Sequence, residues 1–275
     1  MYRSFYIRLL VLICITGVFN SALFAQPVSS SEELAKESEN PVAKLISVPF
    51  NSNFNFGYGD PESTQYILDI KPVIPFSLNT NWNLITRTIF PVMHQQKVSS
   101  TGQRSYINGM SDITPTFFLS PAHPEHLIWG VGPAIVLPTA TEKQLGQGKY
   151  SIGPSIVALI MPGNWVAGFL VFNVWSVGGQ SNRPNVNQLE LQYFVNYNFP
   201  HGWYVTTQPI ILANWTETAD NRWTVPFGLG AGRVFKIAEQ AVNVSLQAYD
   251  NVKTPKAGGA NWQAQFNINL LFPKA

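Results

Sequence analysis

The sequence predicts an all-β protein, an antiparallel up-and-down transmembrane β-barrel of about twelve strands, with ten to fourteen as the range. Three observations lead to this fold class: an export signal, a series of two-faced strands, and connections that alternate between short and long. The final strand, 261–272, shows the two faces best, because apolar residues alternate with Asn and Gln. A face of amides opposite an unbroken apolar face suits a wet lumen inside and lipid outside.

The N-terminus has the pattern of a secretory signal peptide. Arg3 and Arg8 flank the start of a short apolar core that runs from Leu9 to Phe19, and the small residue Ala25 follows. The core is too short to span a bilayer, so we expect cleavage near Ala25. Cys14 is the only cysteine of the chain and lies inside this segment. The mature protein would therefore have no disulfide and no thiolate nucleophile.

The composition fits an exported membrane protein. Only 12% of the residues are charged and 13% are aromatic, whereas about a quarter of the residues of an ordinary protein are charged. Two of the 17 basic residues, Arg3 and Arg8, lie in the signal peptide, which leaves fifteen against 15 acidic residues. A neutral mature chain argues against a nucleic-acid partner. We expect instead the bacterial outer membrane, with outer-membrane lipid and the barrel-assembly machinery as partners.

Twelve alternating or strongly apolar runs have the length of tilted transmembrane strands. They are 44–56, 65–76, 82–93, 112–119, 127–137, 150–160, 165–177, 188–199, 203–215, 222–235, 242–249 and 262–272. Five links between them are tight (77–81, 120–126, 161–164, 200–202 and 236–241), and six are longer and polar (57–64, 94–111, 138–149, 178–187, 216–221 and 250–261). Short and long links alternate strictly, as the periplasmic turns and external loops of bacterial barrels do.

Prolines are the main evidence against continuous strands, because each removes a donor from the hydrogen-bond ladder. Eight lie inside the predicted strands: Pro72, Pro75, Pro91, Pro115, Pro133, Pro154, Pro209 and Pro226. We expect kinks or early breaks at these positions.

The residues before the first strand have a different character. Ser30 and Glu33 fit a capping box, and the pair Asn40-Pro41 would end a helix. The sequence thus divides into a signal peptide (1–25), a periplasmic segment (26–43) and the barrel (44–275). Within the second part the pattern indicates a short helix over 29–39. Whether it plugs the barrel or lies in solvent stays open, and a loose polar tail is the more ordinary outcome.

Three tryptophans follow tight turns directly. Trp82, Trp165 and Trp203 each begin a predicted strand at the same end of the barrel. Because aromatic rings collect where a membrane meets water, we expect them to form part of an interface girdle. Packing against a hairpin corner is the alternative.

Charged residues inside the predicted strands are expected to face the lumen, since a charge in lipid is costly. The lumen and selectivity candidates are Asp69, Lys71, Arg87, Asp112, Glu190 and Arg233. Lys71, Arg87 and Glu190 are the residues most expected to share one cluster. They could form an eyelet that selects solutes by charge, or a salt-bridged network that fills a narrow barrel, which is the more ordinary outcome.

Several stretches together resemble one family of Gram-negative exported proteins. They are 39–47, 71–76, 82–88, 117–121, 129–133, 137–141, 223–227 and 271–274. With them the chain resembles the outer-membrane proteins of the phenol-degradation meta-pathway type, some of which carry the misleading label neuromedin U. The resemblance implies an outer-membrane, porin-like barrel that transports small organic compounds, aromatic or hydrophobic ones among them. It supplies no catalytic residue.

Motifs for catalysis or metal binding are weak. Residues 145–151 have the wrong spacing for a phosphate loop, and His123 and His126 lack further ligands. No serine lies in a nucleophile elbow, so we expect no enzyme, no metal and no cofactor. A passive channel for small organic solutes is the leading hypothesis. A structural or adhesive barrel with a plugged lumen is the alternative, and an outer-membrane hydrolase is a weaker one.

Overall fold

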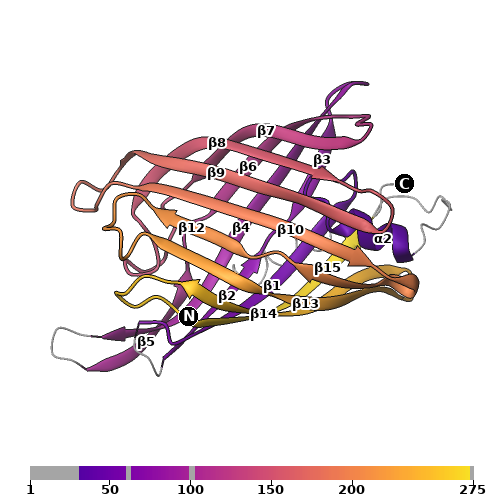
Figure 1. Cartoon of the computed structure of the whole chain (residues 1–275). Coiled ribbons are helices and arrows are strands. Elements are labelled where there is room, and N and C mark those ends of the chain that lie inside the picture. The colour runs from indigo at the N-terminus through magenta and orange to yellow at the C-terminus, as the bar shows by residue number, and fades with distance from the viewer. Residues whose placement is uncertain (1–30, 60–62, 99–102, 273–275) are drawn as a thin grey trace, which may run out of the picture. The chain divides into compact units, whose positions relative to one another are not determined.

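The computed structural model describes residues 31–59, 63–98 and 103–272, so the predicted signal peptide lies outside the described residues. Fifteen strands form a single antiparallel sheet around a short helix, α2 (Ser31–Ser38) (Figure 1). The strands are β1 (Ile46–Phe56), β2 (Thr64–Ile70), β3 (Val73–Ser77), β4 (Trp82–Val98), β5 (Arg104–Met110), β6 (Thr114–Pro121), β7 (Leu127–Val136), β8 (Lys149–Ile160), β9 (Trp165–Gly179), β10 (Asn187–Asn198), β11 (Trp203–Thr207), β12 (Ile210–Asn214), β13 (Trp223–Ile237), β14 (Gln240–Lys253) and β15 (Trp262–Phe272).

The sheet closes on itself. Consecutive strands pair, apart from the two segments of an interrupted strand. In addition, β15 pairs with β1, and the pairing of β9 with β10 completes the ring. Three of the twelve barrel strands are interrupted, as β2 with β3, β5 with β6, and β11 with β12. The predicted twelve-stranded barrel is therefore confirmed. In the described part of the chain, no helix is long and apolar enough to cross a membrane.

The interruptions explain where the prolines are tolerated. Pro72 lies between β2 and β3, and Pro209 lies between β11 and β12. At Pro226 the register between β13 and β14 shifts. A break or shift relieves the ladder of a donor that proline cannot supply. The expected kinks are confirmed at these three positions, while Pro133 and Pro154 pair directly within continuous strands.

The connections are sorted as predicted, with one difference. The end of the barrel with the five short turns, which we call the short-turn end, carries the two-residue turn between β13 and β14. The opposite, long-loop end differs from the prediction between residues 94 and 111. There β4 and β5 extend the sheet as a hairpin, in which His94 stacks on Tyr106 at 4.9 Å between ring centroids. Polar side chains on both faces of this hairpin hide the strand pattern that sequence analysis relies on.

The inward and outward faces of the barrel have different chemistry. On β15, Trp262 is 54% exposed on the outside, while Gln265 and Asn269 are buried on the inside. Inward amides continue across β14 and β1. The inner wall from β3 to β10 instead carries a buried apolar cluster that includes Ile85, Phe118, Val157, Leu170, Phe172 and Phe194, beside buried polar residues such as Thr116 and Ser155. The lumen therefore has one amide wall and one wall with a large apolar cluster, which we call the apolar wall.

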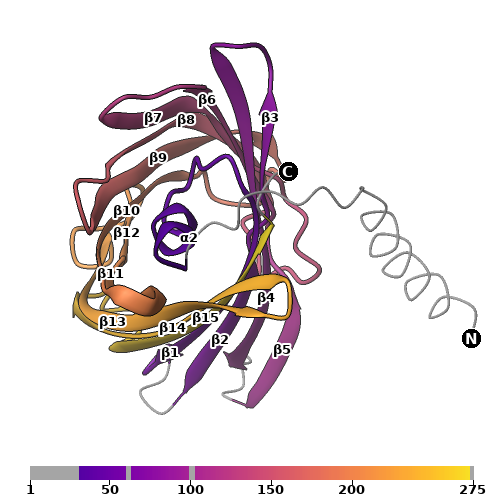
Figure 2. The ribbon, with the colours of Figure 1, turned by 90° about the vertical axis from the view of Figure 1, so that its right-hand side faces the viewer.

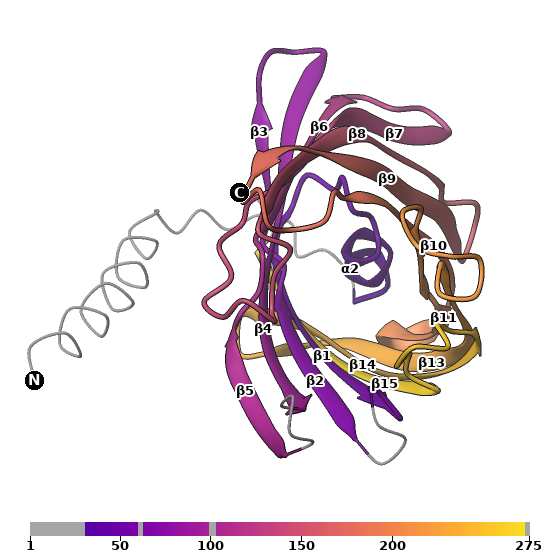
Figure 3. The ribbon, with the colours of Figure 1, turned by 90° about the vertical axis from the view of Figure 1, so that its left-hand side faces the viewer.

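Helix α2 lies inside the ring of strands (Figures 2 and 3). Its Leu34 and Ala35 are buried, and they cluster with the inward residues Tyr204, Val234, Ala241 and Leu271. Val42, farther along the same segment, packs into the apolar wall on the other side. The short helix is confirmed, while the loose polar tail, the more ordinary outcome on sequence grounds, is wrong because Leu34 and Ala35 are buried. We call residues 31–45 the plug, because they occupy the lumen at the short-turn end.

Candidate functional site

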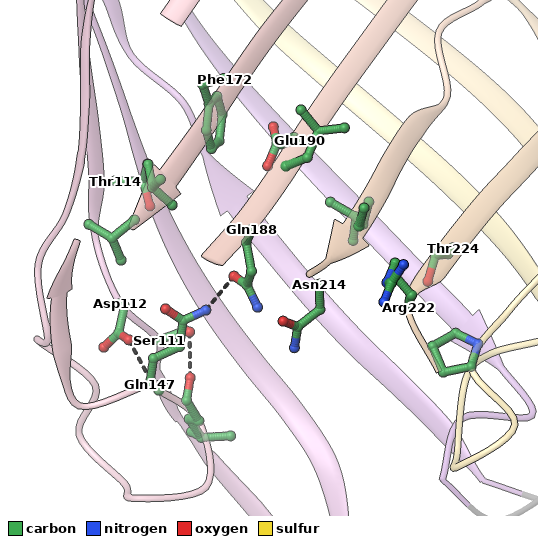
Figure 4. A pocket seen from close by; sticks show the side chains of 18 of the residues that line it. Ser111, Asp112, Thr114, Gln147, Phe172, Gln188, Glu190, Asn214, Arg222 and Thr224 are labelled. Atoms are coloured by element: carbon green, nitrogen blue, oxygen red, sulfur yellow. Dashed lines mark hydrogen bonds between the residues drawn. The ribbon is translucent and has the colours of Figure 1, made fainter. Parts of the chain in front are cut away.

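The lumen holds a cavity of about 620 Å³ toward the long-loop end, which we call the vestibule. Figure 4 shows polar and apolar side chains lining it together, with Glu190 near Phe172 and with Arg222 near Asn214 and Thr224. A cavity of this size and mixed lining is typical of sites that take small organic molecules.

The loop 138–148 borders the vestibule and is fixed by Asp112. The Asp112 carboxylate accepts hydrogen bonds from the backbone N–H of Ala140 at 3.1 Å and of Gln147 at 2.6 Å. The Gln147 amide in turn donates to Gln188 on β10, at 2.5 Å (Figure 4). Asp112 lines the vestibule as expected, but its oxygens hold the loop. Its part in selecting solutes stays a prediction.

Four of the predicted lumen charges form one group, which we call the charge cluster. Asp69 and Lys71 form an ion pair, with 3.2 Å between carboxylate oxygen and ammonium nitrogen. Asn53 also donates to Asp69, at 3.2 Å. Arg87 and Glu190 interact electrostatically with each other and with this pair. The structure thus brings together the residues that were expected to share a cluster, with Asp69 added.

Arg233 lies elsewhere, so its placement among the lumen charges needs correction. Its side chain is exposed, on the outward face of β13 that also carries Phe227 and Leu229. The guanidinium lies over the ring of Trp203, 5.1 Å from its centroid, near the short-turn end. An arginine close to the end of a strand can extend its side chain toward water at little cost in free energy. Such a residue can therefore lie on the outward face as well as in the lumen.

The charge cluster separates the vestibule from smaller cavities near the plug. Glu190 lines the vestibule, whereas Lys71 and Arg87 line a cavity of about 110 Å³ that we call the lower cavity. Ser38 and Glu39 of the plug line the lower cavity too. A path along the lumen would therefore lead from the vestibule past the charges to the plug.

Hydrogen bonds to the barrel wall hold the plug in addition to its buried apolar residues. Glu32 accepts from the backbone N–H of His201 at 2.8 Å, and Lys36 donates to the carbonyl of Gly163 at 2.5 Å. Deeper inside, Asn243 donates to Ser38 at 3.0 Å and to Glu39 at 3.1 Å. Such contacts join the plug to three different parts of the barrel.

Glu39 is a partly buried carboxyl that forms no ion pair in the described part of the chain. Asn196 donates to its second oxygen at 3.3 Å. Burial raises the pKa of Glu39 to about 7, and the hydrogen bonds from Asn243 and Asn196 offset only part of this. Its protonation therefore changes near neutral pH.

The three predicted girdle tryptophans lie at the short-turn end with aromatic or cationic neighbours. Trp82 meets Trp129 edge-on at 6.0 Å, and Trp165 meets Tyr197 at 4.8 Å. Trp165 and Trp203 are about half exposed on the outside of the barrel. Their contact with lipid stays a prediction.

Sequence analysis missed Glu39 and its partners as functional residues. Glu39 lies outside the strands, and Asn243 is 204 residues away in the chain. The one available signal was Leu34-Ala35, an apolar pair in an otherwise polar segment, which indicates a helix that docks on something.

Fold and site together define a class: a closed, twelve-stranded barrel whose hollow lumen is occupied at one end by an N-terminal plug. Among solved structures, the chain is similar to the COG4313 outer membrane channel from Pseudomonas putida F1, with a TM-score of 0.59 and 13% identity over 83% of this chain and 94% of that one. It is also similar to the NanC porin, with a TM-score of 0.50 and 10% identity over 82% and 100% of the two chains. At these identities the likeness concerns the fold. No family model and no curated protein matches the sequence.

Proposed function

We propose that the protein is an outer-membrane channel for the passive passage of small organic compounds. The proposal rests on one observation: the barrel is hollow on the long-loop side of the plug. The vestibule of about 620 Å³ adjoins the charge cluster and, beyond it, the lower cavity. A barrel built only as a scaffold would gain stability by filling that space with side chains, because empty space forfeits packing contacts.

The two-walled lumen supports small organic molecules as the solutes. Amides such as Asn51 and Asn269 on one wall can bind polar groups, while Val73 and Phe194 on the other offer apolar contact. Aromatic or hydrophobic compounds with one polar group match both walls. The resemblance to barrels of the phenol-degradation meta-pathway type agrees with this solute class.

The outward faces support residence in a membrane. Large apolar side chains such as Phe227, Leu229 and Leu246 are more than 60% exposed on the outside of the barrel. Exposed apolar area on this scale is unfavourable in water and favourable in lipid. We propose that Trp82, Trp165 and Trp203 mark the periplasmic interface, so that the plug enters from the periplasm. Insertion of such a barrel would use the barrel-assembly machinery.

The plug is the specific observation that favours the alternative, a structural or adhesive barrel with a closed lumen. The plug is one short segment with few hydrogen bonds to the barrel, although Leu34, Ala35, Ala43 and Leu45 also pack against the wall. We propose that this segment shifts to let solutes pass. Displacement of a small segment is within the range of motions that gate other proteins.

Liposome swelling tests the proposal. Liposomes that contain the purified protein should swell in arabinose faster than protein-free liposomes. Equal swelling rates, with the protein shown to be folded by a heat-modifiable gel shift, would support the closed barrel instead.

A further inference from the structure

Arg87 has hydrogen-bonding capacity that the protein leaves unused. The side chain is only 6% exposed, and its Nη1 atom has no hydrogen-bond partner among the described residues. A guanidinium carries five N–H donors in a planar fork. Burying such a cation with unmet donors is costly, so the arrangement calls for an explanation beyond folding.

Of the two cations in the charge cluster, Lys71 already has an ion-pair partner. The Lys71 ammonium lies 3.2 Å from Asp69, which also accepts from Asn53. No ion pair within 4.0 Å joins Arg87 to Glu190 in the described part of the chain, although the two interact electrostatically. Arg87 is therefore the cation that is free to meet an incoming anion.

The surroundings of Arg87 combine polar donors with an apolar surface. Arg87 lines the lower cavity together with Lys71 and the amide of Asn51. Val73 and Phe194 line the same cavity and belong to the apolar wall. A ligand that fits this setting has one anionic group and an apolar body.

We propose that the lower cavity binds the carboxylate of small organic monoacids, with Arg87 as the principal donor and Val73 and Phe194 in contact with the apolar part of the ligand. This inference rests on the proposed channel function and names a substrate class for it. The planar fork of a guanidinium matches the two oxygens of a carboxylate and forms parallel hydrogen bonds with it.

The carboxylates near the site favour a monoanion over a dianion such as phosphate. Glu190 lies on the vestibule side of Arg87, and Glu39 lines the lower cavity itself. Two ligand charges would be repelled by these groups more than one. Because burial raises the pKa of Glu39 to about 7, that group is mostly neutral at pH 6 and repels an anion less there than at pH 8.

Calorimetric titration of the purified, detergent-solubilised protein tests the proposal directly. Sodium benzoate is the probe, and benzamide is its neutral counterpart of the same shape. Benzoate should bind wild-type protein at least ten-fold more tightly than benzamide. Arg87→Gln should weaken benzoate binding at least ten-fold and leave benzamide unchanged, whereas Arg233→Gln, which removes an outward-facing arginine, should change neither.

Equal benzoate affinity in wild type and Arg87→Gln would overturn the proposal, and so would equal affinity for benzoate and benzamide or no benzoate binding at all. If Arg87→Gln fails the heat-modifiable gel shift, Arg87→Lys replaces it. Lysine keeps the charge but lacks the planar fork. Benzoate affinity should therefore be lower than in wild type but higher than at a site without the charge, and an unchanged benzoate affinity contradicts the role of Arg87.

The binding test and the channel test can fail separately. Benzoate binding without arabinose-driven liposome swelling would leave the site standing and reject the channel. Swelling without benzoate binding would leave the channel standing and reject the carboxylate site.

Discussion

At the scale of single residues, Glu39 links the plug to pH. A docked Glu39 has a pKa of about 7 against 4.5 in water, so docking favours its neutral form. The free energy that neutral Glu39 contributes to docking of the plug is fully present below pH 4.5. It decreases as the pH rises from 4.5 to about 7, and it is lost above about 7. The shift corresponds to about 3 kcal/mol between the two extremes.

We therefore expect the plug to be more mobile at pH 8 than at pH 5. A nitroxide label on Lys36→Cys, placed in a chain whose only other cysteine lies in the predicted signal peptide, would report this by its EPR line shape. Glu39→Gln should abolish the pH dependence, because glutamine does not titrate. A mobility that follows pH equally in both proteins would refute the role of Glu39.

Asp112 should control the loop 138–148. Removing its carboxylate in Asp112→Ala leaves two backbone N–H groups without their acceptor, so the loop should loosen. Limited trypsin digestion should cut after the exposed Lys143 about ten times faster than in wild type, if opening of the loop limits cleavage. Asp220→Ala is the control, because Asp220 forms only a surface ion pair with Lys256 and should not affect this cut.

Residue placement could be predicted where strand periodicity applied. Asp69 and Lys71 share one face of a predicted strand, and both lie in the charge cluster. The predicted position of Arg233 was wrong because the cost of a charge in lipid was given more weight than strand alternation. The alternation places Arg233 on the same outward face as Phe227 and Leu229. The position of Glu39 depends on contacts distant in sequence, and no local pattern reveals those.

At the scale of elements, the plug is the part whose movement the proposed function requires. Asn243 Nδ2 and Ser38 Oγ lie 3.0 Å apart, so a short bis-methanethiosulfonate crosslinker should join cysteines at these positions and tie the plug to the barrel. Crosslinked Ser38→Cys/Asn243→Cys protein should lose arabinose flux in liposomes, and a reductant that cleaves the crosslink should restore it. Ser38→Cys alone serves as the control, since it cannot be crosslinked to the barrel. Unchanged flux in the locked protein would mean that solutes pass around the plug.

The elements themselves were largely predictable, since twelve strands with sorted links follow from alternation and turn residues. The β4–β5 hairpin was not, because both of its faces are polar and the strand signal depends on contrast between faces. Docking of α2 inside the lumen was also beyond sequence reasoning. The pattern of a short amphipathic helix indicates that the helix packs against a partner, but it does not identify that partner.

At the scale of the whole molecule, the outward apolar surface and the closed ring require a lipid environment. The protein should fractionate with outer membranes and should migrate faster on gels when unheated than when boiled, because a closed barrel resists detergent. Recovery in the soluble periplasmic fraction would contradict the membrane assignment.

The central claim is that solutes pass through the lumen, and single-channel recording in planar bilayers tests it most directly. Wild-type protein in potassium chloride should give discrete conductance steps, with a larger open fraction at pH 8 than at pH 5 as the plug loosens. Folded protein that inserts into the bilayer yet gives no conductance at either pH would contradict the account.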